Sequence, residues 1–248
     1  MPESNHSPTL RVCALYPDLM NIYADRGNML MLERRCRWRG LGFSLSGAGI
    51  GDSVDADGAD LYYMGGGQDR DQLLCADDLV ATKCGALRDA ARRGAVILGV
   101  CGGYQLLGRE YQLGSETLPG IGLIDAHTVR SDEPRLIGNV AIEVDLPGAG
   151  QQTLAGFENH GGRTHLGAAA TPLGRVLRGH GNNGVDGGEG ARSGNVIGTY
   201  LHGPLLPKNA WFADWLITTA LRLERPLSPL DDDLEARVHA DARKAAGL

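Results

Sequence analysis

Residues 94–108 read GAVILGVCGGYQLLG, and this stretch decides the fold. Ala95–Val100 is a short apolar run, long enough for a buried parallel strand and too short to cross a membrane. Tyr104–Leu107 has the apolar spacing of a helix start. A strand, a sharp turn and a helix would place Cys101 at the apex, in the glycine-x-nucleophile-x-glycine arrangement called a nucleophile elbow.

Cys101 has the surroundings of a reactive thiol. Glycines on both sides permit a strained turn and a close approach of neighbouring backbone. A helix N-terminus beside the sulfur would favour thiolate over thiol, and the N–H of Gly102 would form half of an oxyanion hole. A cysteine next to a strand is more often a small buried hydrophobe. Here the glycines, the strand and the helix together favour a nucleophile.

The composition is that of a globular protein. The chain has 248 residues, 42% of them hydrophobic, which suffices for one α/β domain with a sizeable core. A net charge of −6 and a pI of about 5.6 argue against a nucleic-acid binder. The start of the chain is polar and no run reaches the length of a transmembrane helix. The five cysteines form no C-x-x-C pair and no metal-ligand spacing, so we expect a cytoplasmic protein without a metal site.

Strand and helix patterns alternate along the chain. This alternation predicts an α/β fold with a doubly wound, mostly parallel sheet. Strands are predicted at 10–16, 41–46, 59–64, 95–100, 118–124, 136–146 and 195–201. Helices are predicted at 29–39, 69–93, from 104 onward, at 209–223 and at 234–246. We expect 1–9 to be a flexible N-terminal tail, 10–224 the main domain and 225–248 a charged helical tail.

Three local predictions accompany this outline. Residues 25–28 are expected to cap the first helix. The arginines near the end of that helix are expected to form a solvated face favoured by the helix dipole; they are Arg34, Arg35, Arg37 and Arg39. Residues 179–194, which contain seven glycines, are expected to form a mobile loop or a turn-rich flap.

Two further features lie at the predicted carboxyl edge of the sheet. Gly65, Gly66 and Gly67 follow a strand, and a loop there could supply the second N–H of an oxyanion hole, although a tight turn would also explain them. His202 closes a later strand and precedes Gly-Pro. An elbow cysteine and a histidine at one sheet edge constitute a nucleophile–base pair.

Five stretches now carry a resemblance that spans nearly the whole chain. They are YPDLMNIYADRGN at 16–28, GGGQDRDQ at 65–72, VCGGYQLLG at 100–108, GFENHGGRT at 156–164 and GTYLHGPLLPKN at 198–209. With them the chain resembles class I, triad-type glutamine amidotransferases of the cobyric acid synthase branch. More closely it is similar to the GatD-type subunits of bacterial lipid II isoglutaminyl synthases (GatD/MurT). The elbow is common to many amidotransferases, whereas the first, fourth and fifth stretches are typical of the GatD type.

The resemblance implies a flavodoxin-like amidotransferase fold and a set of site residues. Cys101 matches the nucleophile and His202 its partner. Gly66 or Gly67, with Gly102, matches the oxyanion hole, and Gln105 is expected to contact the substrate. Arg135 is the best positional match for the arginine that holds the glutamine α-carboxylate, with Arg130 as the nearby alternative. A guanidinium can hold a carboxylate in a bidentate contact.

The activity implied is hydrolysis of glutamine to glutamate and ammonia through a cysteine thioester. Most triad-type enzymes carry a glutamate two residues after the histidine, and here that position is Pro204. The orienting acid would then be dispensable, come from elsewhere in the chain, or come from a partner, which we favour. The chain also lacks a phosphate-binding G-x-x-x-x-G-K-[ST] loop. We therefore expect no cofactor on this chain, with ATP and Mg²⁺ on a MurT-like, Mur-ligase-like partner that amidates the D-glutamate α-carboxyl of lipid II.

Three alternatives remain at this stage. An amidotransferase serving cobyrinate or another acceptor would share the elbow, but the fourth and fifth stretches argue against it. An inactive scaffold subunit would explain the missing acid, but not the retention of Cys101, His202 and the glycine loops. A cysteine hydrolase of peptides on the same fold would act without any partner.

Overall fold

The computed structural model describes residues 7–22, 25–202 and 204–248. Its centre is a six-stranded sheet of order β13-β14-β4-β3-β1-β2. The strands of this sheet are β1 (Thr9–Leu15), β2 (Gly42–Ala48), β3 (Leu61–Met64), β4 (Val96–Val100), β13 (Ala191–Ser193) and β14 (Val196–Thr199). All neighbours are parallel except β13 and β14. The predicted α/β class with a mostly parallel central sheet is therefore confirmed.

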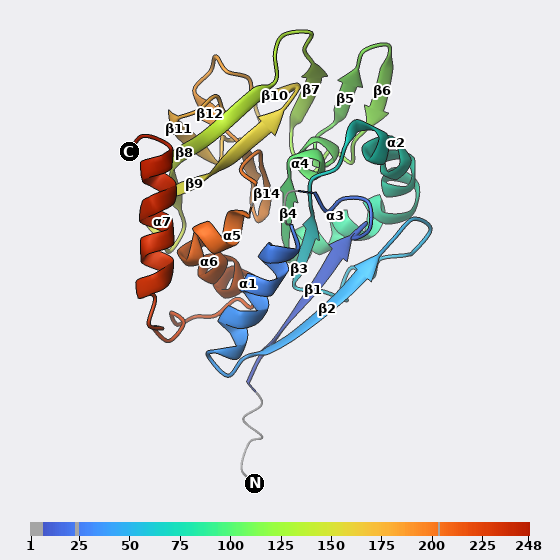
Figure 1. Cartoon of the computed structure of the whole chain (residues 1–248). Helices are drawn as coiled ribbons and strands as arrows, with labels where there is room; N and C mark the ends of the chain where they lie inside the picture. Colours follow the sequence, from blue (N-terminus) through green and yellow to red (C-terminus); the bar gives the residue numbers. More distant parts are fainter. Residues whose placement is uncertain (1–6, 23–24, 203) are drawn as a thin grey trace.

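Helices cover both faces of this sheet (Figure 1). They are α1 (Arg26–Arg37), α2 (Asp69–Asp78), α3 (Cys84–Arg93), α4 (Gly102–Leu107), α5 (Leu205–Lys208), α6 (Ala210–Ala220) and α7 (Asp233–Ala245). Helices α1 and α6 pack together on one face, while α2, α3 and α4 lie on the other. The helix predicted over 69–93 is continuous but contains a π-helical turn, η1 (Leu79–Lys83), between α2 and α3.

Two smaller four-stranded sheets flank one end of the central sheet (Figure 1). One has the order β10-β7-β5-β6 and consists of β5 (Glu110–Leu113), β6 (Glu116–Pro119), β7 (Ala126–Arg130) and β10 (Gly162–Leu166). The other has the order β12-β11-β8-β9 and consists of β8 (Leu136–Leu146), β9 (Gly150–His160), β11 (Gly174–Arg178) and β12 (Gly188–Glu189). The strand predicted over 118–124 is wrong beyond Pro119, because the backbone of residues 120–124 bonds back to the α4 segment instead.

The prediction of a solvated arginine face at the end of α1 is wrong for two of its members. Arg35 is fully buried and Arg39 nearly so. The Arg35 guanidinium binds Asp214 of α6, with Nε donating to Oδ1 at 2.8 Å, and also binds Asp232 just before α7. Arg35 faces inward because it continues the apolar stripe of Met29 and Leu32 at helical spacing. It therefore ties three separate segments together.

The glycine-rich stretch 179–194 is not a free flap but is anchored to the interior. The buried Glu158 carboxylate accepts the N–H groups of His180 and Gly181 at 2.7 and 2.9 Å. The Asn182 side chain donates to the carbonyl of Gly190 at 2.8 Å. Buried polar side chains rather than apolar ones fix this segment, which is why its hydrophobic pattern gave no sign of order.

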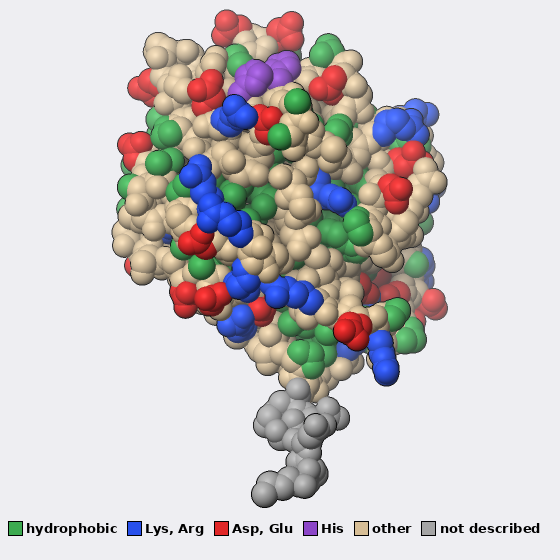
Figure 2. Space-filling view, turned by 180° about the vertical axis from the view of Figure 1, so that it is seen from behind, with side chains coloured by type: hydrophobic (Ala, Val, Ile, Leu, Met, Phe, Trp, Pro, Cys, Tyr) green, Lys and Arg blue, Asp and Glu red, His purple; other side chains and the backbone are tan. Residues whose placement is uncertain are grey.

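The surface carries charges of both signs. On the face seen in Figure 2, lysine and arginine side chains lie among aspartate and glutamate side chains, without a continuous basic patch among the residues shown in colour. Among the described residues, no helix is both long and apolar enough to traverse a bilayer.

The Arg35 contact yields a stability prediction. Arg35→Ala should lower the free energy of unfolding by about 3 kcal/mol, because two carboxylates lose a buried, bidentate partner. Urea unfolding with an unchanged m-value measures this loss. The control is Arg37→Ala, which removes only an exposed ion pair with Glu33 and should cost about 0.5 kcal/mol or less. Equal effects of the two substitutions would contradict the role assigned to Arg35.

Candidate active site

The predicted strand–turn–helix around Cys101 is present. Strand β4 is buried along its whole length, Cys101 has φ +53° and ψ −107°, and α4 starts at Gly102. A positive φ is strained for a cysteine and persists only when its surroundings hold it. Gly103 is required here, since a Cβ on it would lie 2.2 Å from the carbonyl oxygen of Met64. The turn is thus set by close backbone packing between β3 and α4.

Cys101 lies at the wall of a cavity of about 380 Å³, here called the Cys101 cavity. Its backbone N–H donates to the carbonyl of Thr199 at 2.8 Å, which joins the elbow to the end of β14. The described residues that line the cavity with it are Ile22, Gly67, Gln68, Asp69, Arg70, Gln72, Gln105, Tyr111, Arg135, Asn159, His160 and Gly161.

The thiol is in its neutral form at neutral pH. Burial raises the pKa of Cys101 to about 12, and the Asp25 charge acts in the same direction. The Gly102 N–H and Arg135 act against this rise. The expected thiolate-favouring effect of the helix start is therefore present but is outweighed by desolvation.

Residues 65–68, here called the glycine loop, lie between β3 and α2 directly beside the elbow. The Gly66 N–H donates to the Asp25 carboxylate at 3.0 Å. A Cβ on Gly102 would lie 3.0 Å from the backbone nitrogen of Gly67, so these two amides are neighbours. Gly66 is also close to the elbow, since a Cβ on it would lie 3.5 Å from the Cβ of Cys101. Its N–H is occupied by Asp25, which leaves the N–H of Gly67 as the candidate for the second oxyanion-hole donor.

Asp25 is a residue whose role the sequence did not reveal. It was expected in the cap of α1, but its side chain makes no cap hydrogen bond. The buried carboxylate instead accepts the hydroxyl of Tyr63 at 2.5 Å and the N–H of Gly66. Burial raises its pKa to about 6. Asn28 continues this contact by donating to the Tyr63 hydroxyl at 2.8 Å and accepting the N–H of Leu206 at 2.8 Å.

His202 lies three residues beyond β14, and Cys101 one residue beyond β4. Because β4 and β14 are parallel neighbours with Val100 opposite Thr199, the two side chains belong to the same edge of the sheet. The His202 Nε2 accepts the backbone N–H of Asn159 at 3.2 Å. Burial lowers the pKa of His202 to about 4, with the charges of Lys208 and Arg135 adding to this effect. His202 is not one of the described residues that line the Cys101 cavity.

Arg135 and Arg130 have different surroundings. Arg135 lines the cavity and donates twice to Asn159, from Nε to Oδ1 and from Nη2 to the backbone carbonyl, both at 2.8 Å. Two of its five N–H groups are used in these bonds, so others can turn to a carboxylate. Arg130 is bound to Asp69 and is not among the described residues lining the cavity. The geometry favours Arg135 over Arg130 as the carboxylate ligand.

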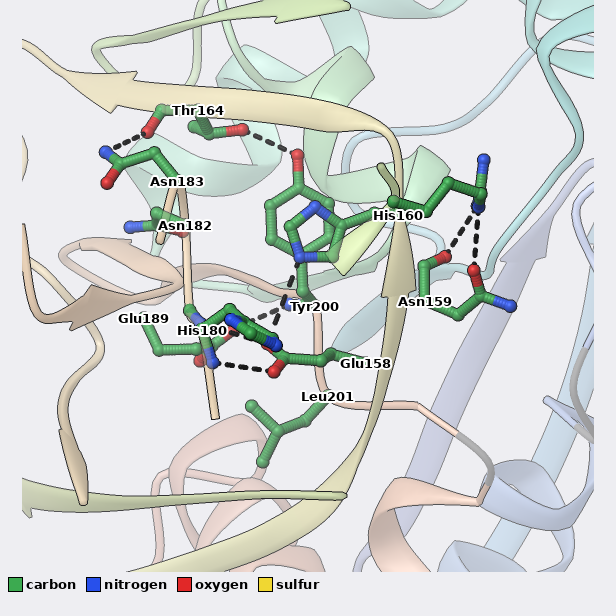
Figure 3. Close-up of polar contacts among 12 residues, drawn as sticks. Glu158, Asn159, His160, Thr164, His180, Asn182, Asn183, Glu189, Tyr200 and Leu201 are labelled. Atoms are coloured by element: carbon green, nitrogen blue, oxygen red, sulfur yellow. Dashed lines mark hydrogen bonds and ion pairs between the residues drawn. The ribbon is translucent and has the colours of Figure 1, made fainter. Parts of the chain in front are cut away.

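Buried polar side chains gather around Tyr200 (Figure 3). Gln105 lines the cavity and donates to the Tyr200 hydroxyl at 3.1 Å. The His160 ring stacks on Tyr200 with ring centroids 3.6 Å apart, and burial lowers the pKa of His160 to about 3. Glu189 accepts the N–H of Tyr200 at 2.6 Å, and burial raises its pKa to about 8. These contacts fix the segment between β14 and His202. Sequence reasoning missed them because each joins residues far apart in the chain.

The described residues offer no set of three His, Cys, Asp or Glu side chains that could hold a metal ion.

Comparison with known proteins identifies the family of the chain. Residues 11–210 match the CobB/CobQ-like glutamine amidotransferase domain. The chain belongs to this family. It is a glutamine amidotransferase.

Two curated relatives and one solved structure are similar to most of the chain. It is 38% identical to the lipid II isoglutaminyl synthase (glutamine-hydrolyzing) subunit GatD of Streptococcus pneumoniae, over 89% of this chain and 84% of that one. It is 39% identical to the subunit of the same name from Staphylococcus aureus, over 90% of this chain and 89% of that one. The solved structure of PurLQS from Thermotoga maritima covers 86% of this chain and 95% of its own, with a TM-score of 0.56 and 21% identity, which supports the fold.

The raised thiol pKa predicts a pH dependence of alkylation. Since the folded-state pKa of Cys101 is about 12, its thiolate fraction should rise about ten-fold per pH unit between pH 8 and 10. The rate of iodoacetamide labelling, followed by mass spectrometry of the Cys101 peptide, should rise in parallel without a plateau. A plateau below pH 8 would contradict the dominance of burial. The Cys101→Ala variant gives the background from the other four cysteines.

Proposed function

We propose that this chain is the glutaminase subunit of a lipid II isoglutaminyl synthase. The observation that carries the proposal is the position of Cys101 at a strained strand–helix turn, hydrogen-bonded to the end of the strand that leads to His202. The similarity to two GatD subunits, over about nine-tenths of the chain in each case, supports lipid II amidation as the process served.

The proposed reaction is acyl transfer to Cys101. The thiolate attacks the side-chain carboxamide of L-glutamine, and the oxyanion forms against the N–H groups of Gly67 and Gly102. His202 takes the thiol proton and returns it to the departing ammonia. Water then hydrolyses the thioester, and glutamate is released. Arg135 holds the α-carboxylate, and Gln105 forms part of the cavity wall.

Cys101 and His202 are both neutral at neutral pH. The mechanism must therefore include a proton transfer from the thiol to the imidazole. Proton transfer from thiol to imidazole would create two charges in a buried site, which desolvation opposes. The His202 Nε2 must also exchange its contact with the Asn159 N–H before it can take a proton from sulfur. Asn159 is bound to Arg135 as well, so a substrate carboxylate that draws Arg135 can loosen the Asn159 contact with His202.

We further propose that a partner subunit completes the enzyme. Pro204 occupies the position of the usual orienting acid, and an acid from the partner would stabilise the imidazolium of His202. A MurT-like synthetase would bind ATP and Mg²⁺ and activate the D-glutamate α-carboxyl of lipid II, and this chain would supply ammonia to it. We expect this heterodimer to work in the cytoplasm. ATP and Mg²⁺ would bind the partner, so this chain itself would need no cofactor.

Substitutions of the proposed catalytic residues test the glutaminase step. Cys101→Ala and His202→Ala should each lower kcat for glutamine hydrolysis by at least about 10³-fold, because each removes a group that reacts or carries a proton. Glutamate release, measured alone and with the partner, reports the activity. A glutamine-mimicking diazo-ketone should modify Cys101 alone in the unsubstituted chain. Full labelling of the Cys101→Ala variant would refute the assignment of the nucleophile.

A reconstitution experiment tests the acceptor. The chain mixed with a MurT-like synthetase, ATP, Mg²⁺, glutamine and lipid II should amidate lipid II, and the Cys101→Ala variant should support the same reaction only when free ammonia replaces glutamine. Mass spectrometry of lipid II shows the change from carboxyl to carboxamide. Glutamine hydrolysis combined with amidation of cobyrinate and not of lipid II would favour the other acceptor.

A further inference from the structure

Asp69 is an acidic residue at the wall of the Cys101 cavity that the reaction described above does not use. It is the first residue of α2, directly after the glycine loop. Its side chain is 37% exposed, so a molecule in the cavity can reach it. Its negative charge contributes to the raised pKa of the Cys101 thiol, as expected of a charge near the sulfur.

Two neighbours fix the orientation of the Asp69 carboxylate. Arg130 from β7 forms an ion pair with Oδ2. The hydroxyl of Tyr111 from β5 lies 3.3 Å from Oδ1. A carboxylate can accept about four hydrogen bonds, so these contacts orient Asp69 without exhausting its capacity. The result is a fixed anionic group facing a cavity that also contains the thiol.

The cavity wall carries one carboxylate and two guanidinium groups. Arg135 is on the wall formed by the β8 and β9 segments, and Asp69 is on the wall formed by the glycine loop and α2, next to Arg70. Among the described residues that line the cavity, Asp69 is the only carboxylate. The amide oxygen of Asn159, a neutral alternative acceptor, is already bound by Arg135 Nε. A zwitterion with a carboxylate and an ammonium on one carbon fits this charge pattern.

The geometry points to Asp69 as the residue that recognises the α-ammonium group of the substrate, with Arg130 as the positioning residue that orients it. This assignment rests on the proposed glutaminase function, in which the carboxamide meets Cys101 and the carboxylate meets Arg135. It makes the site selective for α-amino acid amides over amides that lack the amino group. It also separates the two arginines, because Arg135 binds the ligand while Arg130 binds Asp69.

Equilibrium binding to the full-length Cys101→Ala variant tests the assignment without turnover. The two probes are L-glutamine and 4-carbamoylbutanoate, which is glutamine without its α-amino group. The Cys101→Ala variant should bind glutamine at least about ten-fold more tightly than 4-carbamoylbutanoate. Adding Asp69→Asn should weaken glutamine binding by about ten- to a hundred-fold and change the Kd of 4-carbamoylbutanoate by less than about two-fold. Isothermal titration calorimetry gives both constants.

Two further variants separate recognition from folding. Asp77→Asn lies on the exposed side of the same helix and should leave both Kd values unchanged. Arg130→Gln should weaken glutamine binding alone, by less than Asp69→Asn does, and Arg130→Lys should restore part of the loss. Loss of affinity for both ligands in Asp69→Asn, unchanged glutamine affinity, or no preference for glutamine in the Cys101→Ala variant would overturn the proposal.

The outcome is distinguishable from failure of the glutaminase assignment. Hydrolysis of glutamine by the unsubstituted chain, together with an equal loss for both probes in Asp69→Asn, would refute the role of Asp69 and keep the glutaminase. Selective binding that Asp69→Asn abolishes, together with no glutamate release from the unsubstituted chain and its partner, would support Asp69 and refute the glutaminase.

Discussion

The site depends on one backbone constraint, which is the positive φ of Cys101 at the end of β4. A cysteine does not adopt this conformation without support, and here two contacts and one glycine supply it. The Cys101 N–H is held by Thr199 on β14, the helix start packs on the carbonyl of Met64, and Gly103 leaves the space that this packing needs. The same contacts place the sulfur beside the glycine loop and join it to the segment that carries His202. The position of the Cys101 sulfur therefore depends on the alignment of the central strands β4 and β14.

Burial gives the site its resting electrostatics. It raises the pKa of the Cys101 thiol and lowers that of the His202 imidazole, so both groups are uncharged at neutral pH. The Gly102 N–H at the start of α4 acts in the opposite direction on the thiol, but burial outweighs it. The same desolvation strengthens any charge pair that substrate or partner introduces. In an enzyme organised in this way, a charge introduced by substrate or partner would favour proton transfer from Cys101 to His202.

The elements of the fold that could be predicted from sequence are those whose signals are local. The apolar run before Cys101 and the glycines around it predict the elbow, and His202 follows from a strand that ends in a polar residue. Asp25 was assigned as a helix cap because its neighbours suggested one, and only the folded chain brings it to Gly66, 41 residues away. Arg35 was expected in solvent because it is charged. Its spacing from Leu32, however, matches the buried stripe of the helix, so the periodicity alone would have predicted that it is buried. The ordered stretch 179–194 has no such signal, since buried Glu158 fixes it from another strand.

The supports of the site differ in kind, and the difference bears on how it works. Cys101 and the glycine loop are held by backbone contacts at the edge of a parallel sheet, and buried Asp25 reinforces the loop. Arg135 and His202 are instead both attached to Asn159, at the end of a long antiparallel strand. Backbone packing between sheet and helix leaves little freedom, whereas side-chain hydrogen bonds can exchange partners at small net cost. Cys101 and the glycine loop therefore form the fixed half of the site. Arg135 and His202, the proposed carboxylate ligand and base, form the adjustable half, joined by their common contact with Asn159.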